Sequence, residues 1–159
     1  MPPAHVQKAQ VAIENIASER RPLVIDTNVV LDLLVFDDPA VRALGAALRR
    51  RTRRWLVTGG MRSELQRVLG YPRIAPRLSA AGLQPADVLA AYDGLTDVVS
   101  AVTPAPLPRC RDADDQPFID LAAAHRALLL SKDGAVLALA RALRAHDVMV
   151  ISKWPPALD

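Results

Sequence analysis

The sequence predicts an α/β fold, with a parallel sheet of about five strands and helices on both of its faces. Short apolar segments typical of buried strands alternate along the chain with longer segments of helical periodicity. Such alternation favours parallel strands joined by right-handed helical crossovers. The 159 residues suit one domain of this kind, and neither an internal repeat nor a linker interrupts the pattern.

The first half of the chain contains two strand candidates, each followed by helical segments. Before them, Val6, Ile13 and Ile16 recur at helical spacing, which predicts an accessory N-terminal helix within residues 1–21. Gly59 and Gly60 form a turn from the second strand into a helix. The predicted elements are a strand over 23–26, helices over 29–36 and 41–48, a strand over 55–58 and a helix over 61–69.

Prolines and glycines divide the second half into shorter segments. The segment 73–83, with Pro76 and Gly82, supports no prediction of its geometry. Three prolines make 103–108 an extended connection, and Pro117 suits the first turn of a helix. The predicted elements are a helix over 85–96, a strand over 98–102, a helix over 117–127, a strand over 128–130, a helix over 135–145, a strand over 148–151 and a C-terminal tail over 153–159.

The composition is that of a globular protein, with 51% hydrophobic and 23% charged residues. The longest run without a charge, 98–108, is too short to cross a membrane. The single Cys110 excludes an internal disulfide and a cysteine-based zinc site, and no signal peptide is apparent. We therefore expect a cytoplasmic protein with no membrane partner.

A run of arginines follows the helix predicted over 41–48. The chain has a net charge of +3, and five of the six residues over 49–54 are Arg. This concentration of charge predicts that Arg50, Arg51, Arg53 and Arg54 contact nucleic-acid phosphates. A solvated helix end, whose cations complement the helix dipole, explains the same run equally well.

Four acidic residues are predicted to meet at one edge of the sheet. Asp26 ends the first strand, Asp133 follows the strand at 128–130, and Asp115 opens the helix before that strand. Glu64 lies one turn into the helix after the second strand and borders its apolar stripe. The carboxyl ends of parallel strands share one edge, so these carboxylates should converge. Asp115 and Asp133 also occupy positions typical of N-caps, which would explain them without a functional site.

Carboxylates gathered in this way repel one another unless a cation lies between them. Oxygen-only ligands point to Mg²⁺ or Mn²⁺. His5, His125 and His146 are too far apart in sequence to have the spacing of zinc ligands. One or two such ions activate a water and neutralise charge on a scissile phosphate, so the implied chemistry is phosphodiester hydrolysis.

Four motifs resemble those of the PIN-domain nucleases. The closest similarity is to the bacterial branch described as toxin components of toxin/antitoxin pairs. The similarity covers about residues 22–152, which we interpret as one PIN-like nuclease domain. The motifs are VIDTNV at 24–29, SEL at 63–65, RDADDQPF at 111–118 and LSKD at 130–133.

This resemblance implies a three-layer α/β/α sandwich, Mg²⁺ or Mn²⁺, and endonucleolytic cleavage of single-stranded RNA. By the resemblance, the four catalytic and metal-binding acids are Asp26, Glu64, Asp115 and Asp133, with Asp112 the best substitute for Asp115. Thr27 or Asn28 matches the polar residue that steadies the first acid. The implied partners are an RNA substrate and a cognate antitoxin protein, and a homodimer is compatible with them.

Two other functions fit parts of the pattern. A phosphatase of the haloacid dehalogenase type also begins with an Asp after an apolar strand, but it needs a second Asp two residues later, where this chain has Asn28. It also needs a lysine, for which Lys132 is a weak candidate. A catalytically silent PIN-fold interaction module is the second alternative, and the complete set of acids argues against it. DNA remains open as a substrate.

Overall fold

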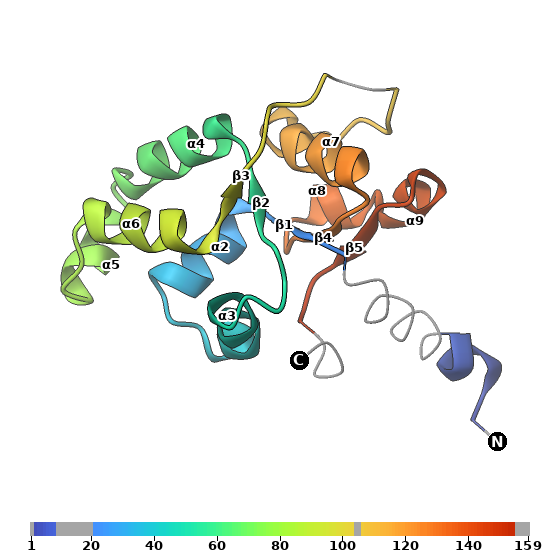
Figure 1. Ribbon diagram of the computed structural model, residues 1–159, viewed down its shortest axis with the longest axis horizontal. Coiled ribbons are helices and arrows are strands. Elements are labelled where there is room, and N and C mark those ends of the chain that lie inside the picture. Colours follow the sequence, from blue (N-terminus) through green and yellow to red (C-terminus); the bar gives the residue numbers. More distant parts are fainter. Residues whose placement is uncertain (1, 9–20, 104–105, 155–159) are drawn as a thin grey trace.

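Five parallel strands form the centre of the molecule in the computed structural model, which describes residues 2–8, 21–103 and 106–154 (Figure 1). Three of the strands form one sheet in the order β1-β4-β5, and β2 pairs with β3. The strands are β1 (Leu23–Ile25), β2 (Leu56–Val57), β3 (Asp97–Val98), β4 (Leu128–Leu130) and β5 (Met149–Ile151).

The two groups of strands meet where β2 comes beside β1. Leu23 forms an isolated parallel bridge with Trp55, and its backbone N–H donates to the Arg54 carbonyl at 2.7 Å. The spatial order is therefore β3-β2-β1-β4-β5, with β1 and β4 in the middle. Every residue of these two central strands is buried, as expected for a parallel sheet covered on both faces. The predicted parallel α/β architecture is confirmed.

The helices lie in two layers, one on each side of the strands (Figure 1). Right-handed crossovers require this division, because the chain moves outward from β1 to β3 and then returns across the sheet to β4 and β5. The first layer contains α2 (Thr27–Leu34), α3 (Arg42–Arg49), α4 (Gly59–Leu69), α5 (Ala75–Ala80) and α6 (Pro85–Leu95). The second layer contains α7 (Gln116–His125), α8 (Gly134–Leu137) and α9 (Ala140–Leu143).

Helix α2 begins two residues earlier than the periodicity predicts. The Asp26 side chain accepts a hydrogen bond from the Val29 backbone N–H and caps the helix directly at the end of β1. Strand and helix are therefore joined by a single residue. This short connection holds the Asp26 carboxylate at the carboxyl edge of the sheet.

Several other predicted boundaries change in the structure. The helix predicted over 135–145 is divided into α8, α9 and the 3₁₀ turn η3 (Arg144–His146), with an i→i+3 bond from Leu139 N to the Val136 carbonyl between the first two. In place of the strand predicted over 98–102, the structure has the two-residue β3, which begins one residue earlier. Helix α5 occupies part of the segment for which no geometry was predicted. Most of the predicted N-terminal helix lies outside the described residues, although residues 4–8 are helical.

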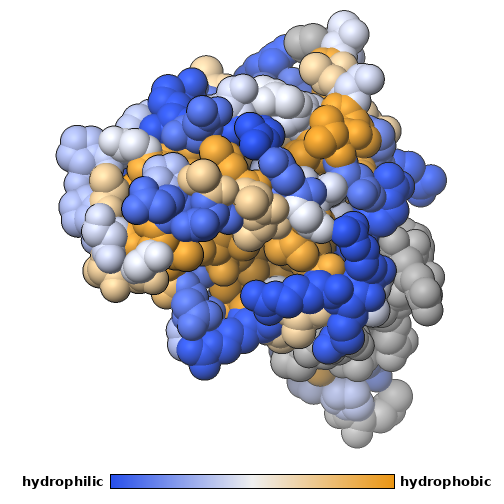
Figure 2. Space-filling view, turned by 60° about the vertical axis from the view of Figure 1, so that its left-hand side comes forward, coloured by the Kyte–Doolittle hydropathy of each residue, from blue (hydrophilic) through white to orange (hydrophobic). Residues whose placement is uncertain are grey.

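The core is largely aliphatic and extends from the sheet into both helical layers. Trp55, directly before β2, is 1% exposed and meets Tyr92 of α6 edge to face, with ring centroids 5.1 Å apart. On the side that carries α5 and α6, apolar side chains gather in the centre of the face, surrounded by hydrophilic ones (Figure 2). Within the described residues, no helix is both long and apolar enough to span a membrane.

Candidate metal centre

Asp26 is the most deeply buried acid at the carboxyl edge of the sheet, with 3% of its surface exposed. One carboxylate oxygen accepts from Val29 N at 3.0 Å. The other oxygen, Oδ2, is buried and has no hydrogen-bond partner among the described residues. Burial raises the pKa of Asp26, and the nearby Asp133 charge adds to this effect, whereas the Ser131 hydroxyl opposes it. Within the described part of the chain, these hydrogen bonds compensate the charge of deprotonated Asp26 only in part, because its pKa stays raised.

Asp115 lies at the end of the 3₁₀ turn η2 (Ala113–Asp115), immediately before α7. Its side chain makes no hydrogen bond to the first turn of α7. Its Oδ2 is instead buried and unpartnered within the described part of the chain. A helix cap, which the sequence left open as an explanation for this residue, is therefore excluded for Asp115.

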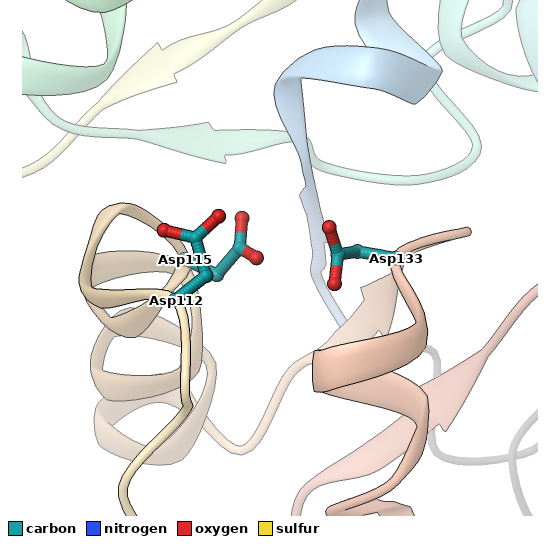
Figure 3. Close-up of side chains that lie close together, drawn as sticks. All are labelled: Asp112, Asp115 and Asp133. Atoms are coloured by element: carbon teal, nitrogen blue, oxygen red, sulfur yellow. The ribbon is translucent and has the colours of Figure 1, made fainter.

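Asp112 and Asp133 complete a compact group with Asp115 (Figure 3). Each of the three offers a carboxylate oxygen, and these oxygens all lie within 4.8 Å of one another. Asp133 follows β4 and also caps α8, because its Oδ1 accepts from Ala135 N at 2.7 Å. Asp133 can cap the helix and also bind a metal ion, since capping uses only one of its two carboxylate oxygens. Asp112, predicted as a substitute for Asp115, lies beside it.

Glu64 approaches the same edge from α4, and it is tied to α2 by Thr27. The Thr27 hydroxyl donates to Glu64 Oε2 at 2.7 Å. The expectation that Thr27 or Asn28 steadies Asp26 is therefore wrong in its details: Thr27 holds the second acid, Val29 N holds the first, and Asn28 is exposed. The reason is that Thr27 is already in the first turn of α2, where it faces α4 across the edge.

The electrostatics of Asp115 show how closely the acids converge. Its pKa is raised to about 7, first by burial and then by the charges of Asp133, Asp112, Asp26 and Glu64. The other three predicted acids, together with Asp112, thus all act on Asp115 at this edge. A carboxyl group with a pKa near 7 is half protonated at neutral pH unless a cation takes the place of the proton.

These observations test whether the residues fit a divalent cation. Two buried carboxylate oxygens without partners, on Asp26 and Asp115, are costly to keep charged unless a cation compensates them. The donors gathered here are all oxygens, as hard cations such as Mg²⁺ and Mn²⁺ prefer. The residues present therefore fit such an ion, with Asp112, Asp115 and Asp133 near enough to share it and Asp26 adjoining them.

A first prediction concerns the stability of the metal-free protein. Above pH 3.8, the ordinary pKa of Asp, the unfolded state loses the Asp115 proton that the folded state retains up to about pH 7, so stability falls across this window. Asp115→Asn removes the effect without losing a cap. In EDTA at pH 8 its melting temperature should exceed the native value by about 2–4 °C for roughly 1 kcal/mol.

At pH 4, where residue 115 is neutral in the folded state of both proteins, the melting temperatures should nearly coincide. Mn²⁺ should raise the melting temperature of the native protein more than that of the variant, because an ion bound only by the folded state stabilises it by mass action. Thermal melts at both pH values, in EDTA and in Mn²⁺, measure these differences. If the variant melts below the native protein at pH 8 in EDTA, the predicted repulsion between Asp115 and the neighbouring acids is contradicted.

Three residues that the sequence analysis did not assign support the acids. Ser131 is fully buried, and its Oγ accepts from Asp133 N at 3.1 Å. Asp32 of α2 is 6% exposed and forms an ion pair with Lys132, the residue next to Asp133. Gln116 bonds to the loop that carries Asp112 and Asp115. Ser131 and Lys132 lie inside the LSKD motif and Gln116 lies inside the RDADDQPF motif, so only their positions indicated a role, whereas no local pattern marked Asp32.

The arginine run lies at the opposite edge of the sheet, because it precedes β2 whereas the acids follow the strands. Arg53 is 8% exposed, and its guanidinium lies over the Trp154 ring, 5.8 Å from the centroid. Its prediction as a phosphate contact is therefore wrong. Arg51 donates to the Gly94 carbonyl and Arg54 pairs with Asp97. For Arg50, Arg51 and Arg54 contact with nucleic acid remains only a prediction, and it would lie away from the acids.

The fold and the site together define a class of protein: a parallel α/β/α domain with a cluster of carboxylates at the carboxyl edge of its sheet. The family model described as PIN domain matches residues 22–145. The chain therefore belongs to the PIN-domain family, whose members are generally nucleases and typically bind divalent metals. No curated protein gave a significant match to the chain.

Proposed function

We propose that this protein is a metal-dependent endoribonuclease that cleaves single-stranded RNA, with Mg²⁺ or Mn²⁺ as its cofactor. The observation that carries the proposal is the pair of buried, unpartnered carboxylate oxygens on Asp26 and Asp115, within a group of five acids. Acids that served only as helix caps would not leave such oxygens buried. The choice of RNA over DNA rests on the resemblance of the motifs.

Each acid has a distinct position in the proposed site. Asp112, Asp115 and Asp133 would hold the ion, with Asp26 contributing its free Oδ2 from the end of β1. When bound, the ion supplies a water of lowered pKa and neutralises charge on the scissile phosphate. Glu64, held by the Thr27 hydroxyl, borders the same space and would accept a proton or orient a water there.

The supporting hydrogen bonds keep this arrangement rigid. Ser131 fixes the backbone of Asp133, Val29 N fixes Asp26, and Thr27 fixes Glu64, so the three side chains are positioned before any substrate arrives. Preorganised groups of this kind stabilise a transition state without a reorganisation cost.

We further propose that the protein is the toxin of a toxin/antitoxin pair and acts in the cytoplasm with a cognate antitoxin as its partner.

The deciding experiment incubates the purified protein with labelled single-stranded RNA and with DNA of the same sequence, each in Mn²⁺ and in EDTA. We expect internal cleavage of RNA in Mn²⁺ and none in EDTA. Cleavage that persists in EDTA would overturn the role of the metal, and cleavage of DNA alone would overturn the proposed substrate. Absence of cleavage of either strand under all conditions would favour the catalytically silent interaction module.

A further inference from the structure

A hollow of about 520 Å³ adjoins the acids on the side of α2 and α5. Its volume is within the range of sites that bind small molecules or parts of larger ones. At one end it is lined by Asn28, Lys132 and Asp133, so it opens onto the metal centre. At the other end it is lined by Phe36, Arg73 and Arg77. The hollow thus leads from the acids to a group of cations.

Three cations line the hollow together with the acids Asp32 and Asp133, and two of these cations have no acidic partner among the described residues. Lys132 pairs with the buried Asp32 and is therefore neutralised locally. No described acid forms an ion pair with Arg73 or Arg77, and both residues are exposed. The far end of the hollow consequently carries two uncompensated positive charges. When a cation is bound by the acids, both ends of the hollow favour anionic groups, so a ligand that spans it would be anionic at more than one point.

Phe36 gives the cationic end a fixed geometry. The Arg77 guanidinium lies over the Phe36 ring, 4.3 Å from its centroid, and this cation–π contact positions it at the end of the hollow. A guanidinium plane held in this way provides a surface for an unpaired base or two donors for a phosphate. A double helix presents no free base to such a surface, so the arrangement favours a single strand.

We propose that this hollow holds the single-stranded nucleic acid on one side of the scissile phosphate, with Arg73 and Arg77 contacting the neighbouring phosphate or base. The inference rests on the proposed function, because the acids define where the scissile phosphate lies. It assigns substrate binding to the edge of the sheet that carries the acids, in place of the arginine run at the opposite edge.

The test measures binding separately from cleavage. Fluorescence anisotropy of a labelled 12-nucleotide RNA, in EDTA and at 50 to 200 mM salt, gives the dissociation constant and its salt dependence without hydrolysis. We expect the double variant Arg73→Gln, Arg77→Gln to bind about tenfold or more weakly at 50 mM salt. Its log–log salt slope should be smaller by about 1.4, which is about 0.7 for each lost phosphate contact on a single strand.

Two further variants keep this result interpretable. Arg49→Gln, Arg50→Gln removes the same charge from exposed positions at the opposite edge, and it should bind as the native protein does. Arg73→Gln alone spares the contact of Arg77 with Phe36, and it should lower the slope by about 0.7 without changing the melting temperature.

Equal loss of binding in the two double variants would overturn the inference, because the effect would then be general charge. Unchanged binding in the Arg73 and Arg77 variants, or no measurable binding by the native protein, would overturn it as well. If these variants bind normally and the native protein cleaves RNA in Mn²⁺, the inference fails and the proposed nuclease function stands. If they bind weakly and the native protein cleaves nothing, the binding site stands and the nuclease function fails.

Discussion

Asp26→Asn is expected to reduce Mn²⁺-dependent cleavage of RNA by about 100-fold or more. A bound ion contributes several kcal/mol of transition-state stabilisation, and each 1.4 kcal/mol corresponds to about a tenfold change in rate. Asparagine keeps the shape of Asp26 and still accepts from Val29 N to cap α2, but it lacks the charge that holds the ion. The rate of appearance of labelled fragments, measured at saturating Mn²⁺, gives the loss directly.

Asp37→Asn is a matched control for this variant. Asp37 is an exposed acid, its ion pair with Arg42 is long at 3.8 Å, and its positive φ of 46° suits asparagine. Cleavage by this variant should equal that of the native protein.

In a bacterial host, induced expression of the native chain should slow growth, and expression of Asp26→Asn should not. Undiminished cleavage by a well-folded Asp26→Asn preparation would remove Asp26 from the metal centre.

Gln116→Met is expected both to destabilise the fold and to weaken metal binding. The buried Gln116 amide accepts from Cys110 N at 2.7 Å and donates to Asp120 Oδ1 at 3.0 Å and to the Pro108 carbonyl at 3.4 Å. Methionine fills a similar volume but leaves these groups without a partner, at a cost of about 2 kcal/mol. The melting temperature should therefore fall by about 4–8 °C.

The same change should affect the ion because Gln116 anchors the loop that carries Asp112 and Asp115. Residues that orient metal ligands in this way typically change affinity by about 10- to 100-fold when they are replaced. Calorimetric titration with Mn²⁺ measures the dissociation constant, and Gln66→Met, on the exposed face of α4, serves as the control. Native Mn²⁺ affinity in a Gln116→Met protein with a lowered melting temperature would show that the acids are held by other contacts.

The acids of the candidate site could be predicted from the sequence because their positions depend on local patterns. An apolar run followed directly by Asp26, and another by Ser131, Lys132 and Asp133, places those groups after strands. In a parallel sheet all such positions share an edge, so convergence follows from the order of the elements alone. The chain order of strands and helices likewise predicted the parallel arrangement that the structure has.

The partners of these acids were decided by packing between segments far apart in the chain. Thr27 meets Glu64 across 37 positions, and Arg53 is buried against Trp154 of the C-terminal segment. No periodicity or motif in the sequence marks either contact, because each contact depends on how two helices or loops meet over the sheet. The sequence analysis therefore assigned Thr27 to the wrong acid and Arg53 to contact with nucleic-acid phosphates.

The sequence by itself determined the class of fold, the edge at which the carboxylates meet and the family to which the chain belongs, since these depend on the order of residues within short segments. Only the tertiary structure showed that Asp115 caps no helix and that Arg73 and Arg77 line a hollow that leads away from the acids. The physical reason is that burial, desolvation and long-range hydrogen bonds arise from the packing of separate elements, and the charge state of Asp115 depends on all of them.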